Sequence, residues 1–81
     1  MGKNYPPLDR GQVENVLKNA GFVFKRHKGT SHSQWEGYIK NMRRIVTVDH
    51  LKSKTEKYGP DLLQKMIQQS GLTKKDFYSF L

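Results

Sequence analysis

The hydrophobic pattern of this chain changes its period along the sequence, and the order of these changes limits the possible folds more than any other feature. An apolar stripe of helical period covers about 10–20, and strand-like alternation and β-branched residues follow over 22–48. A second helical stripe and a short third one come after Pro60. The order of one helix, three strands, one helix and a short helix predicts an α+β fold, with the helices on one face of a three-stranded antiparallel sheet.

Capping residues define the predicted helices. Asp9 is a plausible N-cap for a first helix over about Arg10 to Ala20, and Gly21 follows at the C-terminal end. Pro60 suits the first turn of the second helix, and Gly71 ends it. The buried stripes are predicted to be Val13, Val16, Leu17 and Ala20 in the first helix and Leu63, Met66, Ile67 and Ser70 in the second. Thr73 and Asp76 resemble a capping box for a final helix, whose expected core residues are Phe77, Phe80 and Leu81.

Three strands are predicted between the long helices. The first covers Phe22 to Lys28, with Phe22, Phe24 and Arg26 in alternation, and the second covers Ser31 to Tyr38. Lys40-Asn41-Met42 is the predicted turn before Arg43 to Val48, the clearest strand because it is rich in β-branched residues. The middle of the chain should therefore form an antiparallel meander with one polar face.

Length and composition exclude several classes of protein. Eighty-one residues suffice for one domain, 1–81, which buries only about 60% of its unfolded surface, so no separate cofactor domain is expected. The absence of cysteine excludes disulfides, zinc–thiolate sites and thiol nucleophiles, and it fits a reducing compartment such as the cytoplasm. No apolar run approaches about 20 residues, and Met1 to Pro7 lacks a signal-peptide core, so we expect a soluble protein without a membrane partner.

The positive charge is concentrated in the middle of the chain. The formal net charge is +8, and the segment 25–57 contains nine basic and three acidic residues, which gives it +6 of that total. A field of this sign favours nucleic acid or an acidic protein surface as partner. The alternative is a basic surface that only keeps the protein soluble.

One short segment, 25–35, combines cationic, titratable and aromatic side chains around a glycine. His32 would begin the second strand, where a side chain is held by the sheet and is still reachable by a ligand. Nucleic acid is one of the partners that the charge favours. Cleavage of RNA needs a base near the 2′-hydroxyl, and neutral histidine suits this role. Lys28, with Arg26 or Lys25, could hold the scissile phosphate, and backbone N–H groups around Gly29, Thr30 and Ser31 would supply fixed donors. His50, His27, a lysine or water could protonate the departing 5′-oxygen.

Each of these residues also has a structural interpretation. His32 could merely contact phosphate or cap a turn, His50 could hydrogen-bond the connection to the second helix, and His27 could be a solvated strand residue. Trp35 could stack on a base or belong to the core or a partner interface. Gln34 should share the face of His32 and so touch RNA. The three histidines lack a neighbouring Asp, Glu or Cys cluster, so metal-independent cleavage without a cofactor is expected.

The predicted order of elements is that of a double-stranded-RNA-binding domain, and an ordered set of short motifs resembles the HicA toxin family. These motifs are Gly21-Phe22, Lys28-Gly29 followed by Ser31-His32, Val46-Thr47-Val48 leading to His50, and Ile67 to Phe77. The resemblance implies an mRNA interferase of a toxin–antitoxin pair, with a double-stranded-RNA-binding-like fold and His32 as the catalytic histidine. It also implies mRNA or single-stranded RNA as substrate and a HicB-type antitoxin that masks the site.

The chain differs from the family pattern at two positions. Thr30 lengthens the usual Lys-Gly-Ser-His spacing by one residue, and Asp49 stands where a proline is common before the second histidine. Three hypotheses follow: a ribonuclease toxin that is monomeric when free, a non-catalytic RNA-binding module, and a basic adaptor for an acidic protein. The first requires an essential histidine, the second retains RNA without cleaving it, and the third binds protein but not RNA.

Overall fold

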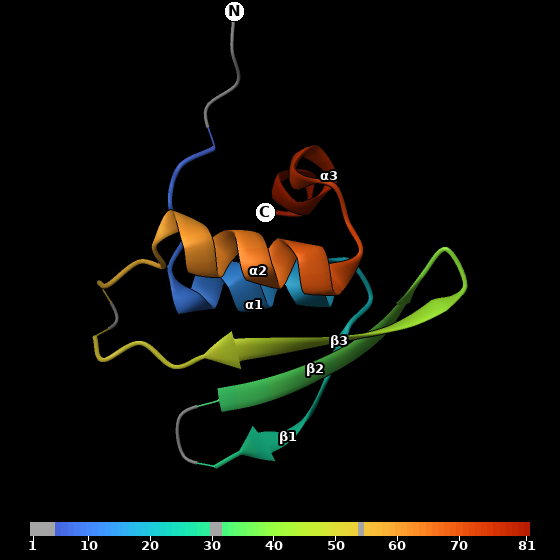
Figure 1. The fold of residues 1–81 in the computed structure, drawn as a ribbon, viewed down its shortest axis with the longest axis horizontal. Helices are drawn as coiled ribbons and strands as arrows, with labels where there is room; N and C mark the ends of the chain where they lie inside the picture. Colours follow the sequence, from blue (N-terminus) through green and yellow to red (C-terminus); the bar gives the residue numbers. More distant parts are fainter. Residues whose placement is uncertain (1–4, 30–31, 54) are drawn as a thin grey trace, which may run out of the picture.

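The computed structural model describes residues 5–29, 32–53 and 55–81 and confirms the α+β architecture. Its strands form one antiparallel sheet in the order β1-β2-β3, and the helices lie on one side of that sheet (Figure 1). In chain order the elements are α1 (Arg10–Asn19), β1 (Val23–Lys28), β2 (His32–Ile39), β3 (Met42–Asp49), α2 (Pro60–Ser70) and α3 (Lys74–Ser79). This is the predicted arrangement, and it is consistent with a double-stranded-RNA-binding-like fold.

Helix α1 begins at a reciprocal capping box. Gln12 N donates to the Asp9 carboxylate at 2.8 Å, and Asp9 N donates to the Gln12 side chain at 2.9 Å. The helix ends at Asn19, one residue earlier than predicted, because Ala20 is its C-cap and Gly21 has a φ of 94°. Its predicted stripe faces the sheet, with Val13, Val16 and Leu17 fully buried and Ala20 partly buried.

Helices α2 and α3 close the domain. All four residues of the predicted α2 stripe are buried, and Gly71 ends the helix in the left-handed region with a φ of 77°. Thr73 caps α3 by accepting from Asp76 N at 3.1 Å, and Phe77 is fully buried. The prediction for Leu81 was wrong: it lies beyond the C-cap Phe80 and is 49% exposed.

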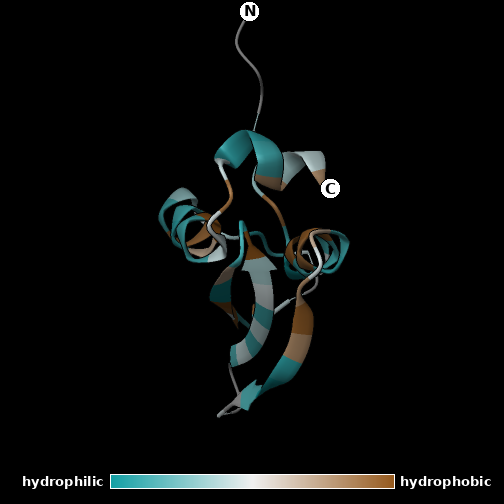
Figure 2. Cartoon of the chain, turned by 90° about the vertical axis from the view of Figure 1, so that its right-hand side faces the viewer, coloured by the Kyte–Doolittle hydropathy of each residue, from teal (hydrophilic) through white to brown (hydrophobic). Residues whose placement is uncertain are grey.

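The core lies between the helices and one face of the sheet. Viewed from the side, α1 and α2 lie next to each other above the strands and turn polar surfaces outward (Figure 2). The sheet contributes Trp35, Val46 and Val48 to this core, and Ser33 is buried on the same side. Within the part of the chain that the structure describes, no helix has the length and apolarity required to span a membrane.

The opposite side of the sheet is not covered by helices, and we call it the open face. His32, Gln34 and Glu36 alternate with the buried residues of β2 and are partly exposed. The strand register places Asp49, Thr47 and Ile45 of β3 opposite them. The described side chains of the open face are Val23, Lys25, Arg26, His32, Gln34, Glu36, Tyr38, Arg43, Ile45, Thr47 and Asp49.

A β-bulge in β1 changes which residues reach this face. The register shifts between Phe24, which pairs with Trp35 on the helix side, and Arg26, which pairs with Gln34 on the open face. The predicted alternation of Phe22, Phe24 and Arg26 along one face was therefore wrong. Because the bulge adds one residue, the consecutive cations Lys25 and Arg26 both reach open-face partners.

The β2–β3 connection is tighter than predicted. Lys40 and Asn41 have φ values of 53° and 67°. A type I′ turn, which is common in two-residue hairpins, requires positive φ at both of its central positions. Met42, which we assigned to the turn, instead begins β3 and pairs with Ile39. The short turn fixes the register that places His32 opposite Asp49 at the other end of the hairpin.

Candidate active site

His32 is held on both sides because it begins the central strand of the sheet. Its Cα partners are Lys28 in β1 and Asp49 in β3. The side chain is 41% exposed on the open face, so a ligand can reach it. The prediction that His32 occupies an accessible strand end is confirmed, and Gln34 lies on the same face as expected.

A carboxylate lies directly against this histidine. Nε2 of His32 is 3.0 Å from Oδ1 of Asp49, an ion pair when the ring is protonated. The hydroxyl of Tyr58 donates to the backbone carbonyl of Asp49, which fixes the end of β3 from the core side. Burial raises the pKa of Tyr58, so the hydroxyl retains its proton at neutral pH. The geometry is that of a histidine oriented by a fixed acid.

The sequence interpretation missed this pairing. It noted Asp49 only as a departure from a family pattern, although a carboxylate at the end of the clearest strand is a signal for a site residue. What the sequence could not give is the register, because the His32–Asp49 contact exists only when these two residues are opposite each other.

The other two histidines lie on the helix side of the sheet. Nε2 of His50 and Oγ of Ser33 form a hydrogen bond of 2.6 Å, and Ser33 is only 1% exposed. The rings of His27 and His50 meet edge to face, with centroids 5.5 Å apart. His27, which is exposed, also contacts the ring of Phe24 at 5.0 Å. The structure thus brings His27 and His50 together but separates them from the face on which His32 lies.

Two cations share a carboxylate further along the open face. Glu36 forms ion pairs with Arg43 and with Lys25, whose Nζ is 3.4 Å from Oε1 of Glu36. The hydrogen bond from Arg43 lowers the pKa of Glu36, with partial opposition from burial and a further lowering by Lys25. Conversely, Glu36 raises the pKa of Arg43. Glu36 and Arg43 are therefore both charged at neutral pH.

The predicted RNA-binding residues converge on the same face where the structure describes them. A shallow hollow of about 280 Å³ is lined by Lys25, Arg26, Gln34, Arg43 and Ile45. Gly29 has a φ of 69° in the turn after β1. Thr30, Ser31 and the side chain of Lys28 fall outside the described residues, so their roles stay predictions. Arg43 was missed because its distance from 25–35 in the sequence gave no hint of its position.

Trp35 has a different environment from the rest of the segment. It is 4% exposed and packs in the core, which agrees with the core alternative and leaves no ring face for a base. Its ring contacts Phe24 at a centroid distance of 5.8 Å. Within residues 5–29, 32–53 and 55–81, no group of three or more His, Asp or Glu side chains is arranged to hold a metal ion.

Residues 10–72 match the family model described as the HicA toxin of bacterial toxin-antitoxin systems. This match covers well over half of the chain. The chain belongs to the HicA toxin family. A search of curated proteins found no match to it. The matched range includes α1, the whole sheet and α2, so His32, Asp49 and the open-face cations all lie in the part that defines this protein as a HicA toxin.

Proposed function

We propose that this HicA toxin is an mRNA interferase, a metal-independent endoribonuclease of the cytoplasm that uses His32 and is neutralised by a HicB-type antitoxin. One observation carries the proposal: an accessible histidine is paired with a fixed carboxylate on the same face as a cluster of cations. A module that only bound RNA would need the cations but would have no use for the His32–Asp49 pair.

His32 acts as the general base in this proposal. It takes the proton of a ribose 2′-hydroxyl, and the 2′-oxygen then attacks the adjacent phosphorus. The bond from phosphorus to the 5′-oxygen breaks, which leaves a 2′,3′-cyclic phosphate on one product and a 5′-hydroxyl on the other. A positioned base of this kind contributes about 10²–10⁴-fold to the rate.

Asp49 positions the base and does not react itself. Its carboxylate holds the imidazole ring through Nε2 and stabilises the positive charge that the ring gains with the proton, as the acid of a catalytic triad does. The strand pairing and the Tyr58 hydroxyl fix Asp49, so little reorganisation accompanies the reaction.

The phosphate gains negative charge in the transition state, and cations on the open face would stabilise that charge. Lys25 and Arg26 lie there, together with Lys28 from the sequence prediction. Since the sheet separates His27 and His50 from this face, we assign the proton for the departing 5′-oxygen to a lysine or to water. The antitoxin would cover His32 and these cations with an acidic surface and so compete with RNA for one site.

The test is RNA cleavage by His32→Ala, with His27→Ala as the matched control. His32 lies on the open face and His27 on the helix side, so the first change should abolish cleavage and growth toxicity and the second should leave both in place. Circular dichroism should show that both variants are folded, because neither side chain is in the core. Cleavage at the full rate by folded His32→Ala would refute the role of His32. RNA binding by the unchanged protein with no cleavage would favour the binding-module alternative.

A further inference from the structure

RNA held at His32 in the proposed function has at least two ways to continue across the described surface. One route leads around the end of the sheet to a hollow of about 470 Å³ beside the start of α1. The other follows the open face along β2 and β3 toward Tyr38. The charges in the two routes differ, and this difference decides which one suits a polyanion.

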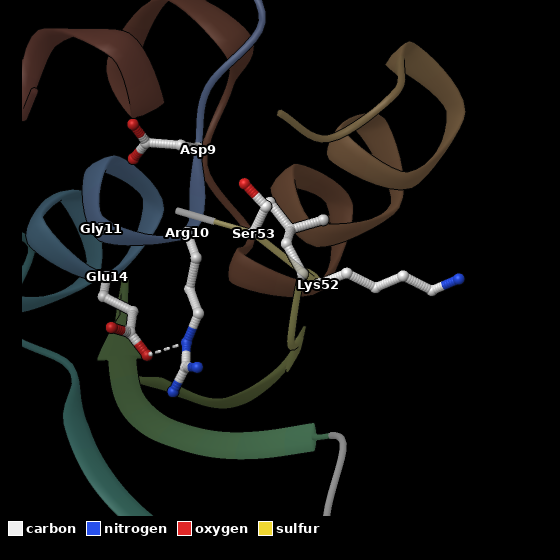
Figure 3. Close-up of a pocket in the computed structure, with 7 residues that line it drawn as sticks. Asp9, Arg10, Gly11, Glu14, Lys52 and Ser53 are labelled. Atoms are coloured by element: carbon white, nitrogen blue, oxygen red, sulfur yellow. Dashed lines mark hydrogen bonds and ion pairs between the residues drawn. The ribbon is translucent and has the colours of Figure 1, made fainter. Parts of the chain in front are cut away.

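The side chains that line the hollow beside α1 have no net charge. Its lining contains two acids and two cations, and the complete lining is Asp9, Arg10, Gly11, Glu14, Leu51, Lys52 and Ser53. Nε of Arg10 is 3.2 Å from Glu14, which already neutralises it, and the side chain of Lys52 extends away from Arg10 (Figure 3). Asp9 is engaged in capping α1. These groups serve the fold and do not form an anion site.

The open face has a continuous row of side chains along β2, with cations beside it. His32, Gln34, Glu36 and Tyr38 follow each other at every second position of β2, so the row spans about 20 Å at roughly 3.3 Å per residue. Three cations flank its middle, Lys25, Arg26 and Arg43, against the single carboxylate Glu36 among the described residues there. The row is therefore net positive between the histidine and the hairpin end.

An exposed aromatic ring stands at the far end of the row. Tyr38 is 67% exposed and lies opposite Arg43 in the strand register. An aromatic ring with a free face stacks on any base, and flanking cations bind the phosphates, which is how single strands are held without sequence preference. A lone tyrosine forms no pattern in the sequence, so the role of Tyr38 becomes visible only when the sheet aligns it with His32.

We infer that single-stranded RNA runs along the open face from His32 to Tyr38, with its phosphates on Lys25, Arg26 and Arg43 and one base on Tyr38. The inference rests on the proposed function and names the substrate path for it. At about 3.4 Å per stacked nucleotide, a row of about 20 Å accommodates roughly six nucleotides. Glu36 holds Lys25 and Arg43 in the row, but its negative charge opposes the phosphates.

This path predicts that substitutions at neighbouring positions change the affinity for RNA in opposite directions. Arg43→Ala should weaken binding similarly for different RNA sequences and lower the magnitude of the log-affinity slope against log salt by about 0.7 at most. Glu36→Gln should tighten binding, because it removes the carboxylate and leaves the cations. Tyr38→Ala should weaken binding about tenfold, whereas Tyr38→Phe retains the stacking ring and should bind like the parent.

The experiment measures binding of labelled oligonucleotides of three to ten nucleotides to the full chain carrying His32→Ala, which prevents cleavage. Lys52→Ala is the matched control, since it removes an exposed cation from the hollow beside α1 and should leave affinity unchanged. Affinity should rise with length up to about six nucleotides and then level off.

Loss of affinity in Lys52→Ala with none in Arg43→Ala would overturn the inference and place RNA on the route toward α1. The proposed function is judged separately, by cleavage in the chain with His32 intact. If that chain binds RNA along the open face but produces no cyclic phosphate, the path stands and the ribonuclease assignment fails.

Discussion

The hydrogen bond between His50 and Ser33 allows a sharp distinction between a structural and a catalytic histidine. Ser33 is 1% exposed, so His50→Ala leaves a buried hydroxyl without this partner. Such a loss costs about 1–3 kcal/mol of unfolding free energy. Ser33→Ala removes the hydroxyl itself, and the partly exposed His50 can turn to water, so it should cost only about 0.5–1.5 kcal/mol.

Both variants should retain the proposed RNA cleavage. A domain of 81 residues has a total stability of about 4–12 kcal/mol, so even the larger loss leaves most molecules folded at 25 °C. Urea unfolding, followed by circular dichroism, gives the stability of each variant and of the double variant. The two changes should be less than additive, because both remove the same hydrogen bond. RNA cleavage at saturating substrate, corrected for the folded fraction, should stay within about twofold of the parent.

One pattern of results would refute this reasoning. If His50→Ala kept its full stability but lost 10²-fold or more of its cleavage rate, then His50 would be a catalytic group of the kind that general acid–base catalysis uses. The same loss in His50→Ala and His32→Ala would mean that the two faces of the sheet cooperate in the chemistry.

Three further predictions address the base, the metal and the core. Asp49→Ala should slow cleavage at saturating RNA about tenfold without weakening RNA binding, because it frees the ring of His32 and removes a negative charge; an unchanged rate would exclude a positioning role. Cleavage should persist in excess EDTA at constant ionic strength, and activity restored only by one divalent ion would contradict the proposal. Gly37→Ala should cost about 1–3 kcal/mol in urea unfolding, since its Cβ would lie 2.7 Å from the Phe22 ring, while Gly59→Ala meets nothing within 4 Å and should be nearly neutral.

The periodic elements were predictable because their signals are local. The stripes of α1 and α2, the β-branched β3 and the glycines after each long helix all appear in short windows of sequence. The place of His32 at a strand end followed from the same patterns. The bulge at Lys25 did not, because no glycine or proline marks it and it arises from how β1 pairs with β2.

The contacts of the candidate site depend on register, which local patterns do not reveal. His32 and Asp49 are seventeen positions apart, and so are Ser33 and His50. A shift of one residue in the β2–β3 pairing would exchange the two faces and break both contacts. The two-residue turn at Lys40-Asn41 sets this pairing, and the prediction of a three-residue turn there was the error that mattered most for the site.

His32 lies on a sheet face that no helix covers, and its side chain is 41% exposed. Water as well as a ligand reaches a side chain with this exposure. Charges on such a surface are screened over about 10 Å at 0.1 M salt, and no single cation can bind RNA firmly. In the proposed RNA path, affinity comes from several phosphate contacts in a row, on the cations beside Glu36. The same openness suits control by a partner protein, because one acidic surface laid on the open face would cover both the histidine and the row of cations.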